Sequence, residues 1–136
     1  MTTIYDVRQG LADAAAHVAG WRTSAYVGEQ VNPPMIKVTM PAFDPRYVLG
    51  ETKARYTFRC YAYYTRAAGE AAERALDELA ELSGAGSLIA AVQDGTNWPI
   101  TVDYAVVTQV GEISTTQFGT DAVEYFVRPF DIEVVW

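Results

Sequence analysis

The chain has 136 residues, half of them hydrophobic and a fifth charged, which is the composition of one folded domain and not of an intrinsically disordered chain. Its formal net charge is −7, and the ten basic residues are scattered, which excludes tight nucleic-acid binding through a cluster of Lys and Arg. The single cysteine, Cys60, excludes an intramolecular disulfide and a cysteine-based metal cage.

The N-terminal sequence predicts a helix over residues 3–19. Thr3 is placed as its N-cap, and Gly20 as the glycine that closes it. The same segment has no basic region ahead of a long apolar core, so we expect no signal peptide. No window in the chain approaches the roughly 18 apolar residues of a spanning helix. We therefore expect a soluble protein that is made in a reducing cytoplasm.

Two short strands are predicted next, over residues 24–28 and 35–40, on either side of Asn32-Pro33-Pro34. A long loop is then predicted over residues 42–52. This loop carries residue types that are favoured at protein interfaces, namely Phe43, Arg46 and Tyr47.

The longest predicted strand covers residues 53–64 and is rich in aromatic residues. Period-two alternation predicts a core face made of Tyr56, Phe58, Cys60, Ala62 and Tyr64. The opposite face is predicted to be half exposed and suited to cover a partner, and it carries Arg55, Thr57, Arg59, Tyr61 and Tyr63.

Thr65 is predicted to cap a helix that ends at Ser83-Gly84-Ala85-Gly86, and Ser87 to cap a short helix after it. The first of these helices has an apolar stripe made of Ala68, Ala72, Ala75, Leu76 and Leu79. Its acidic residues lie opposite that stripe, and we interpret them as a solvated surface.

Two further β segments, residues 100–114 and 121–136, are predicted on either side of a hairpin turn at Gly119. Pro129 is expected to mark an edge position or a bulge in the last segment. The pattern as a whole predicts one α+β domain over residues 1–136. Its sheet is mixed and mainly antiparallel, with about four to six strands, and is flanked by two main helices and one short helix.

We find no motif for catalysis. His17 lacks a second strong ligand, and Cys60 lies on an apolar strand face, so both are interpreted as structural. Gly84 and Gly86 precede a helix without the further residues of a nucleotide-binding loop. We therefore expect no enzymatic activity, no cofactor and no metal. The alternative is a small cytoplasmic enzyme or ligand-binding domain that uses Tyr56, Tyr64 and Asp103.

The remaining candidates are aromatic residues placed for contact with other proteins. They are Tyr61, Tyr63, Tyr47, Phe43, Phe118 and Trp136. A second interpretation, that several of them simply cover the back of the sheet, stays open.

The order of several segments resembles the tail terminator proteins of long-tailed bacteriophages, which are also called tail completion or head-tail joining proteins. The resemblance covers about the last 85 residues and is carried by Phe58 through Tyr64, Ala75-Leu76-Asp77-Glu78-Leu79, Ser83-Gly84, Ser87-Leu88-Ile89-Ala90-Ala91-Val92, Asp94-Gly95, a strand around Val102 to Val110, Gly111 and Tyr125.

The resemblance implies a structural virion protein. Such a subunit forms a ring with its own copies, usually of six, that caps the tail tube, ends tail polymerisation and receives the head connector. Its partners would be itself, the tail tube protein and the connector, and it would be assembled in the host cytoplasm. The acidic balance agrees with DNA passing through the ring without binding its wall. Another neck or tail-tube protein of the same particle is the alternative within this class.

A closed ring needs two different surfaces that match each other. For subunit contact we expect the strand face at Tyr61 and Tyr63 and the edge near Phe130 and Trp136. For contact with the tail tube or the connector we expect the two loops that carry Phe43, Arg46, Tyr47, Phe118 and Asp121.

Overall fold

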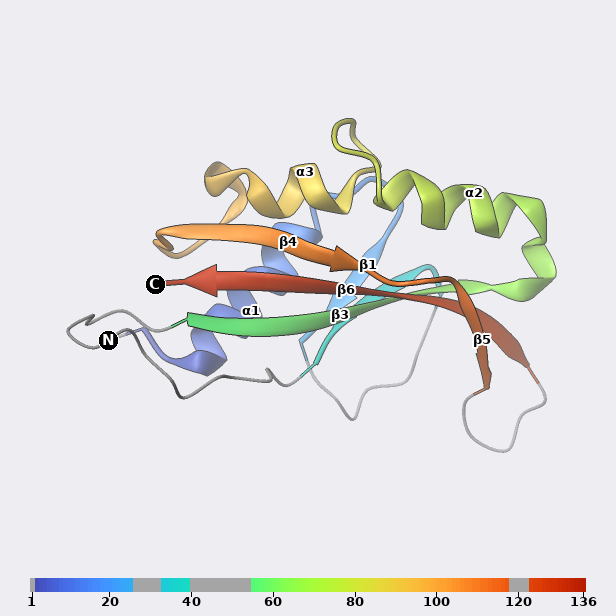
Figure 1. Ribbon diagram of the computed structural model, residues 1–136, viewed down its shortest axis with the longest axis horizontal. Coiled ribbons are helices and arrows are strands. Elements are labelled where there is room, and N and C mark those ends of the chain that lie inside the picture. Colours follow the sequence, from blue (N-terminus) through green and yellow to red (C-terminus); the bar gives the residue numbers. More distant parts are fainter. Residues whose placement is uncertain (1, 26–32, 40–54, 118–122) are drawn as a thin grey trace.

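A six-stranded mixed sheet organises the molecule in the computed structural model, which describes residues 2–25, 33–39, 55–117 and 123–136 (Figure 1). The strand order is β1-β2-β3-β6-β4, and β5 pairs with β6 beside this path. Only β1 and β2 run parallel, and every other pair is antiparallel. Three α-helices accompany the sheet within these ranges. The predicted fold class, an α+β domain with a mixed and mainly antiparallel sheet, is confirmed.

Helix α1 (Ile4–Ala15) begins where the sequence predicts, with Thr3 as its N-cap. The Thr3 hydroxyl accepts from the Asp6 amide at 3.1 Å, and the Asp6 carboxylate accepts from the Thr3 amide at 2.9 Å. This reciprocal capping box satisfies two backbone donors that the first turn leaves unpaired. The helix ends before the predicted residue 19 because the backbone tightens, with the Val18 amide donating to the Ala15 carbonyl. Gly20, at a φ of +83°, lies in the following turn.

The first two strands are short. β1 (Arg22–Ser24) begins two residues before the predicted segment, and residues 26–28 of that prediction lie outside the described ranges. β2 (Met35–Val38) lies within the predicted strand, and all four of its side chains are buried. Burial on both faces explains why this segment shows only weak polar and apolar alternation in the sequence.

The centre of the sheet is the long antiparallel pair β3 (Arg55–Thr65) and β6 (Glu124–Val135). The register pairs Arg55 with Val135 at one end and Thr65 with Tyr125 at the other. β4 (Tyr104–Val110) and β5 (Ser114–Gln117) both pair with the other side of β6. β6 is therefore a central strand, and the predicted single β segment over residues 100–114 is divided between two strands.

The prediction that Pro129 marks an edge position or a bulge holds on one side of β6 only: the pairs Val110–Phe130 and Ser114–Val127 leave residues 111–113 opposite residues 128–129, whereas the pairing with β3 is regular. Pro129 lies in the middle of β6, opposite Tyr61 of β3. Its missing N–H is tolerated because that side faces the break between β4 and β5, where the Gly111 amide donates to the Pro129 carbonyl at 2.8 Å. A further register irregularity lies in β4, between Val107 and Gln109.

Thr65 is the last residue of β3 and the N-cap residue of a 3₁₀ helix, so a helical segment begins where predicted, but the Thr65 side chain makes no capping hydrogen bond and the α-helix begins later. One 3₁₀ turn (Arg66–Ala68) and Gly69, at a φ of +59°, come before helix α2 (Glu70–Leu79). Of the predicted apolar stripe, Ala72, Leu76 and Leu79 are buried and Ala75 is half-buried, whereas Ala68 is exposed and lies in the 3₁₀ turn, so the stripe is confirmed for α2 but not for Ala68. Helix α3 (Leu88–Gln93) is capped as predicted, because the Ser87 hydroxyl accepts from the Ala90 amide at 3.0 Å.

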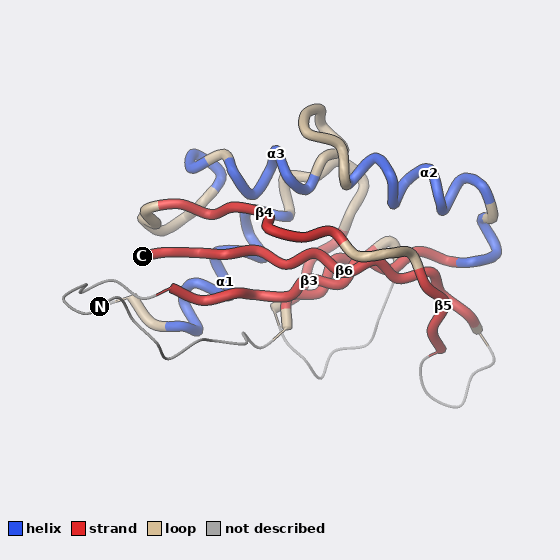
Figure 2. The backbone as a smooth tube through the Cα atoms, in the orientation of Figure 1, coloured by secondary structure: helices blue, strands red, loops and turns tan. Residues whose placement is uncertain are grey.

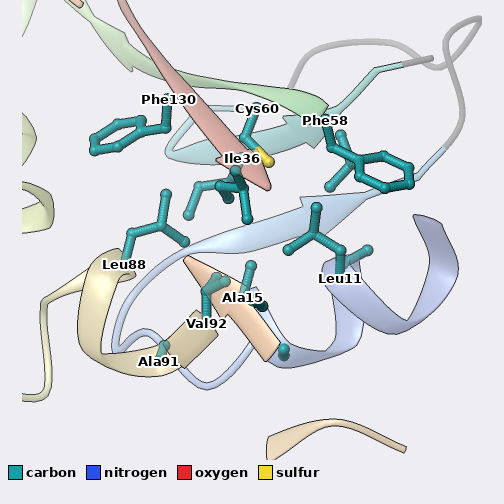
Figure 3. Packing of buried hydrophobic residues seen from close by; sticks show 14 of the residues in the cluster. Leu11, Ala15, Ile36, Phe58, Cys60, Leu88, Ala91, Val92 and Phe130 are labelled. Atoms are coloured by element: carbon teal, nitrogen blue, oxygen red, sulfur yellow. The ribbon is translucent and has the colours of Figure 1, made fainter. Parts of the chain in front are cut away.

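The hydrophobic core lies between the three helices and one face of the sheet (Figure 3). Phe58, Cys60 and Ala62 of β3 are fully buried, so the predicted core face of this strand is confirmed. Leu11 of α1 and Leu88 and Val92 of α3 approach this face from the helical side (Figure 3). The tube view shows the helices on this side and the β5 segment extending away from them (Figure 2). Within the described ranges, no helix is long and apolar enough to cross a membrane.

Candidate interaction surface

The sheet has a second face, opposite the helices, which we call the outer face. Alternation along the strands and direct pairing between them determine its members, because paired residues of neighbouring strands point to the same side. These members are Met35 and Lys37 of β2, Thr57, Arg59, Tyr61 and Tyr63 of β3, Tyr104, Val106 and Gln109 of β4, and Val127, Pro129, Asp131, Glu133 and Val135 of β6.

A bidentate ion pair between Arg59 and Asp131 lies at the centre of the outer face. Arg59 Nε lies 2.7 Å from Asp131 Oδ1, and Arg59 Nη2 lies 3.1 Å from Asp131 Oδ2. The two residues are direct cross-strand partners. Hydrogen bonding to Asp131, followed by that to Tyr61, raises the pKa of Arg59 above its ordinary value. The Arg59 side chain is 53 % exposed, so the pair adds little stability but holds both groups in one geometry.

Two tyrosines lie beside this ion pair. The rings of Tyr61 and Tyr63 have centroids 6.3 Å apart and are tilted by 32°. Tyr61 is half-buried as predicted, whereas Tyr63 is only 8 % exposed. Burial raises the pKa of the Tyr63 hydroxyl, and the neighbouring Tyr61 adds to the rise. The half-exposed surface predicted for this strand face therefore extends over Arg59 and Tyr61 but does not include Tyr63.

The residues expected at the subunit contact do not form one surface. Phe130 is fully buried on the core face, so its placement on an exposed edge is wrong, and β6 is no edge strand. Trp136 stacks on Tyr56 with ring centroids 5.0 Å apart, and its Nε1 donates to the Thr2 carbonyl at 3.3 Å. Trp136 thus packs against its own chain, and of the four residues only Tyr61 and Tyr63 share the outer face.

The residues expected to contact the tail tube or the connector all fall outside the described ranges. They are Phe43, Arg46, Tyr47, Phe118 and Asp121. Their predicted role stays a prediction.

The polar groups of the alternative ligand-binding interpretation do not converge. Tyr56 packs on Trp136, whereas Tyr64 lies edge-on to Trp21 with a centroid distance of 5.7 Å. Tyr56 and Tyr64 are eight residues apart on β3, or about 26 Å at roughly 3.3 Å per residue. Asp103 lies just before β4, where its amide donates to the Val135 carbonyl. These three residues do not line one common site.

The cysteine and the histidine lie in environments that do not favour catalysis. Burial raises the pKa of Cys60 to about 12, which keeps the thiol protonated and unsuited to nucleophilic attack. His17 Nδ1 lies 3.2 Å from the Asp13 carbonyl oxygen, and the residue lines a shallow hollow of about 320 Å³ with Ser87 and Asp94. Hydrogen bonds from Thr96 lower the pKa of Asp94. Across the parts of the chain described, no three His, Cys, Asp or Glu side chains are grouped so as to hold a metal ion.

The pairing of strands adds surface residues that sequence patterns did not single out. Asp131 becomes the partner of Arg59 only through the β3–β6 register, and no local signal indicates this. Tyr104 and Val106, which are 39 % and 40 % exposed, lie at the start of β4, and the Tyr104 hydroxyl donates to Glu133 Oε1 at 2.7 Å. In the sequence, the alternation of Tyr104 and Val106 with Ala105 could have indicated that these two side chains share one face of a strand.

Among the described residues, the structure therefore has a regular outer sheet face with a bidentate ion pair, and the polar side chains considered above do not line one common site. No protein-family model matches the chain, and no curated protein matches it.

Proposed function

We propose that the chain is a structural subunit of a phage virion, a tail terminator-like protein whose copies form a ring on the end of the tail tube. The ring ends tail polymerisation and joins the tail to the head connector. In this proposal the protein is no enzyme and carries no cofactor. Its partners are its own copies in a ring of six, the tail tube protein and the connector, and DNA passes through without specific binding.

The outer face is the observation that carries this proposal. It is built on two strands of eleven and twelve residues, which hold their side chains in a fixed lattice. It presents the tyrosine ring of Tyr61 and the paired charges of Arg59 and Asp131, a mixture that suits contact with protein better than contact with solvent alone. The three described helices pack on the opposite face, and on the outer face Arg59 and Tyr61 stay partly exposed, whereas Lys37, Tyr63 and Val127 are buried.

The order of elements also supports the proposal. The segments that carry the resemblance fold as strand β3, helix α2, helix α3, strand β4 and strand β6, in the order that a tail terminator subunit implies. The acidic residues of α2 lie exposed on the side of the helix that faces away from the sheet. They add to the negative surface charge that would let DNA slide past.

The mass in solution tests the proposal first. A ring of six chains of 15.0 kDa has a mass of about 90 kDa, which light scattering and native mass spectrometry distinguish from a monomer. We expect either this ring or a monomer that becomes a ring on tail tubes, visible by negative-stain electron microscopy. A monomer or dimer that binds a metabolite and never joins tail tubes would contradict the proposal.

A pair of tyrosine variants then tests the surface. Tyr61→Glu introduces a carboxylate beside Asp131 on the outer face and should abolish ring formation while the monomer stays folded. Tyr5→Glu is the matched control, because Tyr5 is 50 % exposed on the first turn of α1, where a negative charge is favourable. If both variants form rings equally well, the outer face is not the subunit contact.

A further inference from the structure

Strand β4 ends the sheet order, and its free side borders a groove. β6 pairs with one side of β4, and no strand in the described ranges pairs with the other. Helix α3 lies beside β4 on that side (Figure 1). Residues of β4, of the end of α3 and of the segment between them line a groove of about 350 Å³. We call it the β4 groove. Its apolar lining consists of Val92, Trp98, Val102, Ala105 and Val106.

The β4 groove has room for a side chain and has an exposed rim. The groove lies at the lower end of the roughly 300–1,000 Å³ that ligand sites occupy. Val106 lines it and is 40 % exposed, whereas Trp98 at its base is only 7 % exposed. The Trp98 indole N–H donates to the Val92 carbonyl at 2.8 Å, which fixes the ring as a rigid wall. An apolar side chain placed on the helical side of β4, against Ala105 and Trp98, would therefore be shielded from water without a rearrangement of this wall.

The backbone of β4 already donates one N–H to an acceptor on the groove side. The Val107 N–H donates to the side-chain carbonyl of Gln93 at 3.2 Å, away from β6. Alternation along the strand directs the N–H and C=O of Ala105 to the same side. The Gln93 carboxamide thus occupies the place that a peptide carbonyl of an added strand would take, and the exchange of one amide for the other is close to neutral in hydrogen bonds.

The charges around the groove favour a basic occupant. Among the described residues that line it, Asp103 is the one with a charged side chain. Glu133 of β6, which accepts from the Tyr104 hydroxyl, is the cross-strand partner of Val106 on the outer face and adds a second negative charge next to β4. The chain as a whole carries a net charge of −7, which attracts a positively charged segment over a longer range.

We propose that the β4 groove binds an extended segment of a partner protein that alternates apolar residues with Lys or Arg. The segment adds to the sheet as a strand beside β4. Its backbone displaces the Gln93 amide from the Val107 N–H, its apolar side chains enter the groove, and its basic side chains lie near Asp103 and Glu133. This inference does not rest on the ring, because the groove is complete within one subunit.

A synthetic peptide that alternates valine and arginine, acetylated and amidated at its ends, is the probe. Added to the isotope-labelled full chain, it should shift the amide NMR signals of Tyr104, Ala105 and Val107 and slow the hydrogen exchange of Ala105. The same peptide with proline in place of its central valine should not bind, since proline removes the donor that strand addition needs. A peptide that alternates valine and glutamate should bind at least tenfold more weakly.

Three variants sharpen the test. Val106→Ser should weaken binding of the arginine peptide about fivefold or more. Val123→Ser is the matched control, because Val123 is 48 % exposed and lies at the start of the segment that leads into β6, far along the sheet from β4. Gln93→Ala removes the competing amide and should tighten binding, an effect that a purely apolar groove would not produce.

Equal binding of the proline peptide, or shifts confined to the outer face, would overturn the proposal. Self-association that Val106→Ser abolishes would also overturn it, by showing that the occupant is a second copy of this chain. If Val106→Ser fails to fold by circular dichroism, the comparison of the three peptides on the unchanged protein still decides the question. Loss of rings in the Tyr61→Glu experiment would leave peptide binding intact, so the two proposals fail independently.

Discussion

Replacement of Arg128 by methionine is expected to destabilise the fold strongly, because this side chain joins three separate elements. Arg128 Nε donates to the Gly111 carbonyl at 3.0 Å, beside the break between β4 and β5. Its Nη1 donates to Asp77 Oδ1 at 2.8 Å and, more weakly, to the Leu76 carbonyl at 3.4 Å, both in α2. The side chain is only 18 % exposed, so water replaces these bonds poorly. Arg128→Met keeps most of the apolar length and removes all three bonds.

The expected loss follows from these contacts. A hydrogen bond from a charged donor is worth roughly 1.5–3 kcal/mol, and part of that is recovered because Asp77 is exposed. Two well-formed bonds and one weak bond give a loss of about 2–4 kcal/mol in the free energy of unfolding. At about 3–4 °C per kcal/mol for a domain of this size, Tm should fall by about 6–15 °C. Thermal and urea unfolding followed by circular dichroism measure both quantities.

The control is Arg74→Met in α2. Arg74 pairs with Glu70 at 3.2 Å, but the two side chains are 76 % and 85 % exposed. Such an i,i+4 pair contributes about 0.3–0.5 kcal/mol, so Tm should fall by no more than about 2 °C. If Arg128→Met and Arg74→Met lowered Tm equally, the view that Arg128 secures the β4–β5 break to α2 would be refuted.

Three further outcomes are expected. Gly111→Ala should destabilise the chain by about 1–3 kcal/mol in urea unfolding, because a Cβ at Gly111 would lie 2.4 Å from Cγ of Pro129, whereas Gly95→Ala, with nothing within 4 Å, should change little; equal effects would contradict this. Hydrogen bonds from Thr3 in the helix cap lower the pKa of Asp6, so the NMR titration of Asp6 should have a midpoint below 3.8. The contribution of Asp6 to stability should then be present above pH 3.8 and decline below it. A midpoint at or above 3.8 would count against the cap. The Cys60 thiol should react with a disulfide reagent at neutral pH only as fast as the chain opens, and rapid labelling of the folded protein would show that it is not buried.

Local signals predicted those elements whose formation depends on neighbouring residues. Thr3 and Ser87 are short polar side chains placed just before apolar periodic segments, and both form the expected caps. The alternation of β3 correctly indicated Phe58 and Cys60 as core residues, since alternate side chains of a strand must point to opposite faces.

Apart from the end of helix α1, which a local tightening of the backbone moves, the predictions that the structure corrects depend on contacts between distant segments. Pro129 suggested an edge, but a break between β4 and β5 allows a proline without a donor in the centre of the sheet. Phe130 was expected at a contact because its strand was taken as an edge, and burial against the helices places it in the core. Thr65 was expected to cap an α-helix, but its pairing with Tyr125 continues the strand by hydrogen bonds that a local pattern does not reveal.

By itself, the sequence determined the class of the fold, the positions of the main helices and the faces of the long strand, because these depend on side-chain periodicity and capping within a few residues. Only the tertiary structure decided which strand is central, which carboxylate pairs with Arg59 and where β4 leaves a free side next to α3. Those outcomes depend on strand order and register, which arise from the packing of residues many positions apart, such as Arg59 and Asp131.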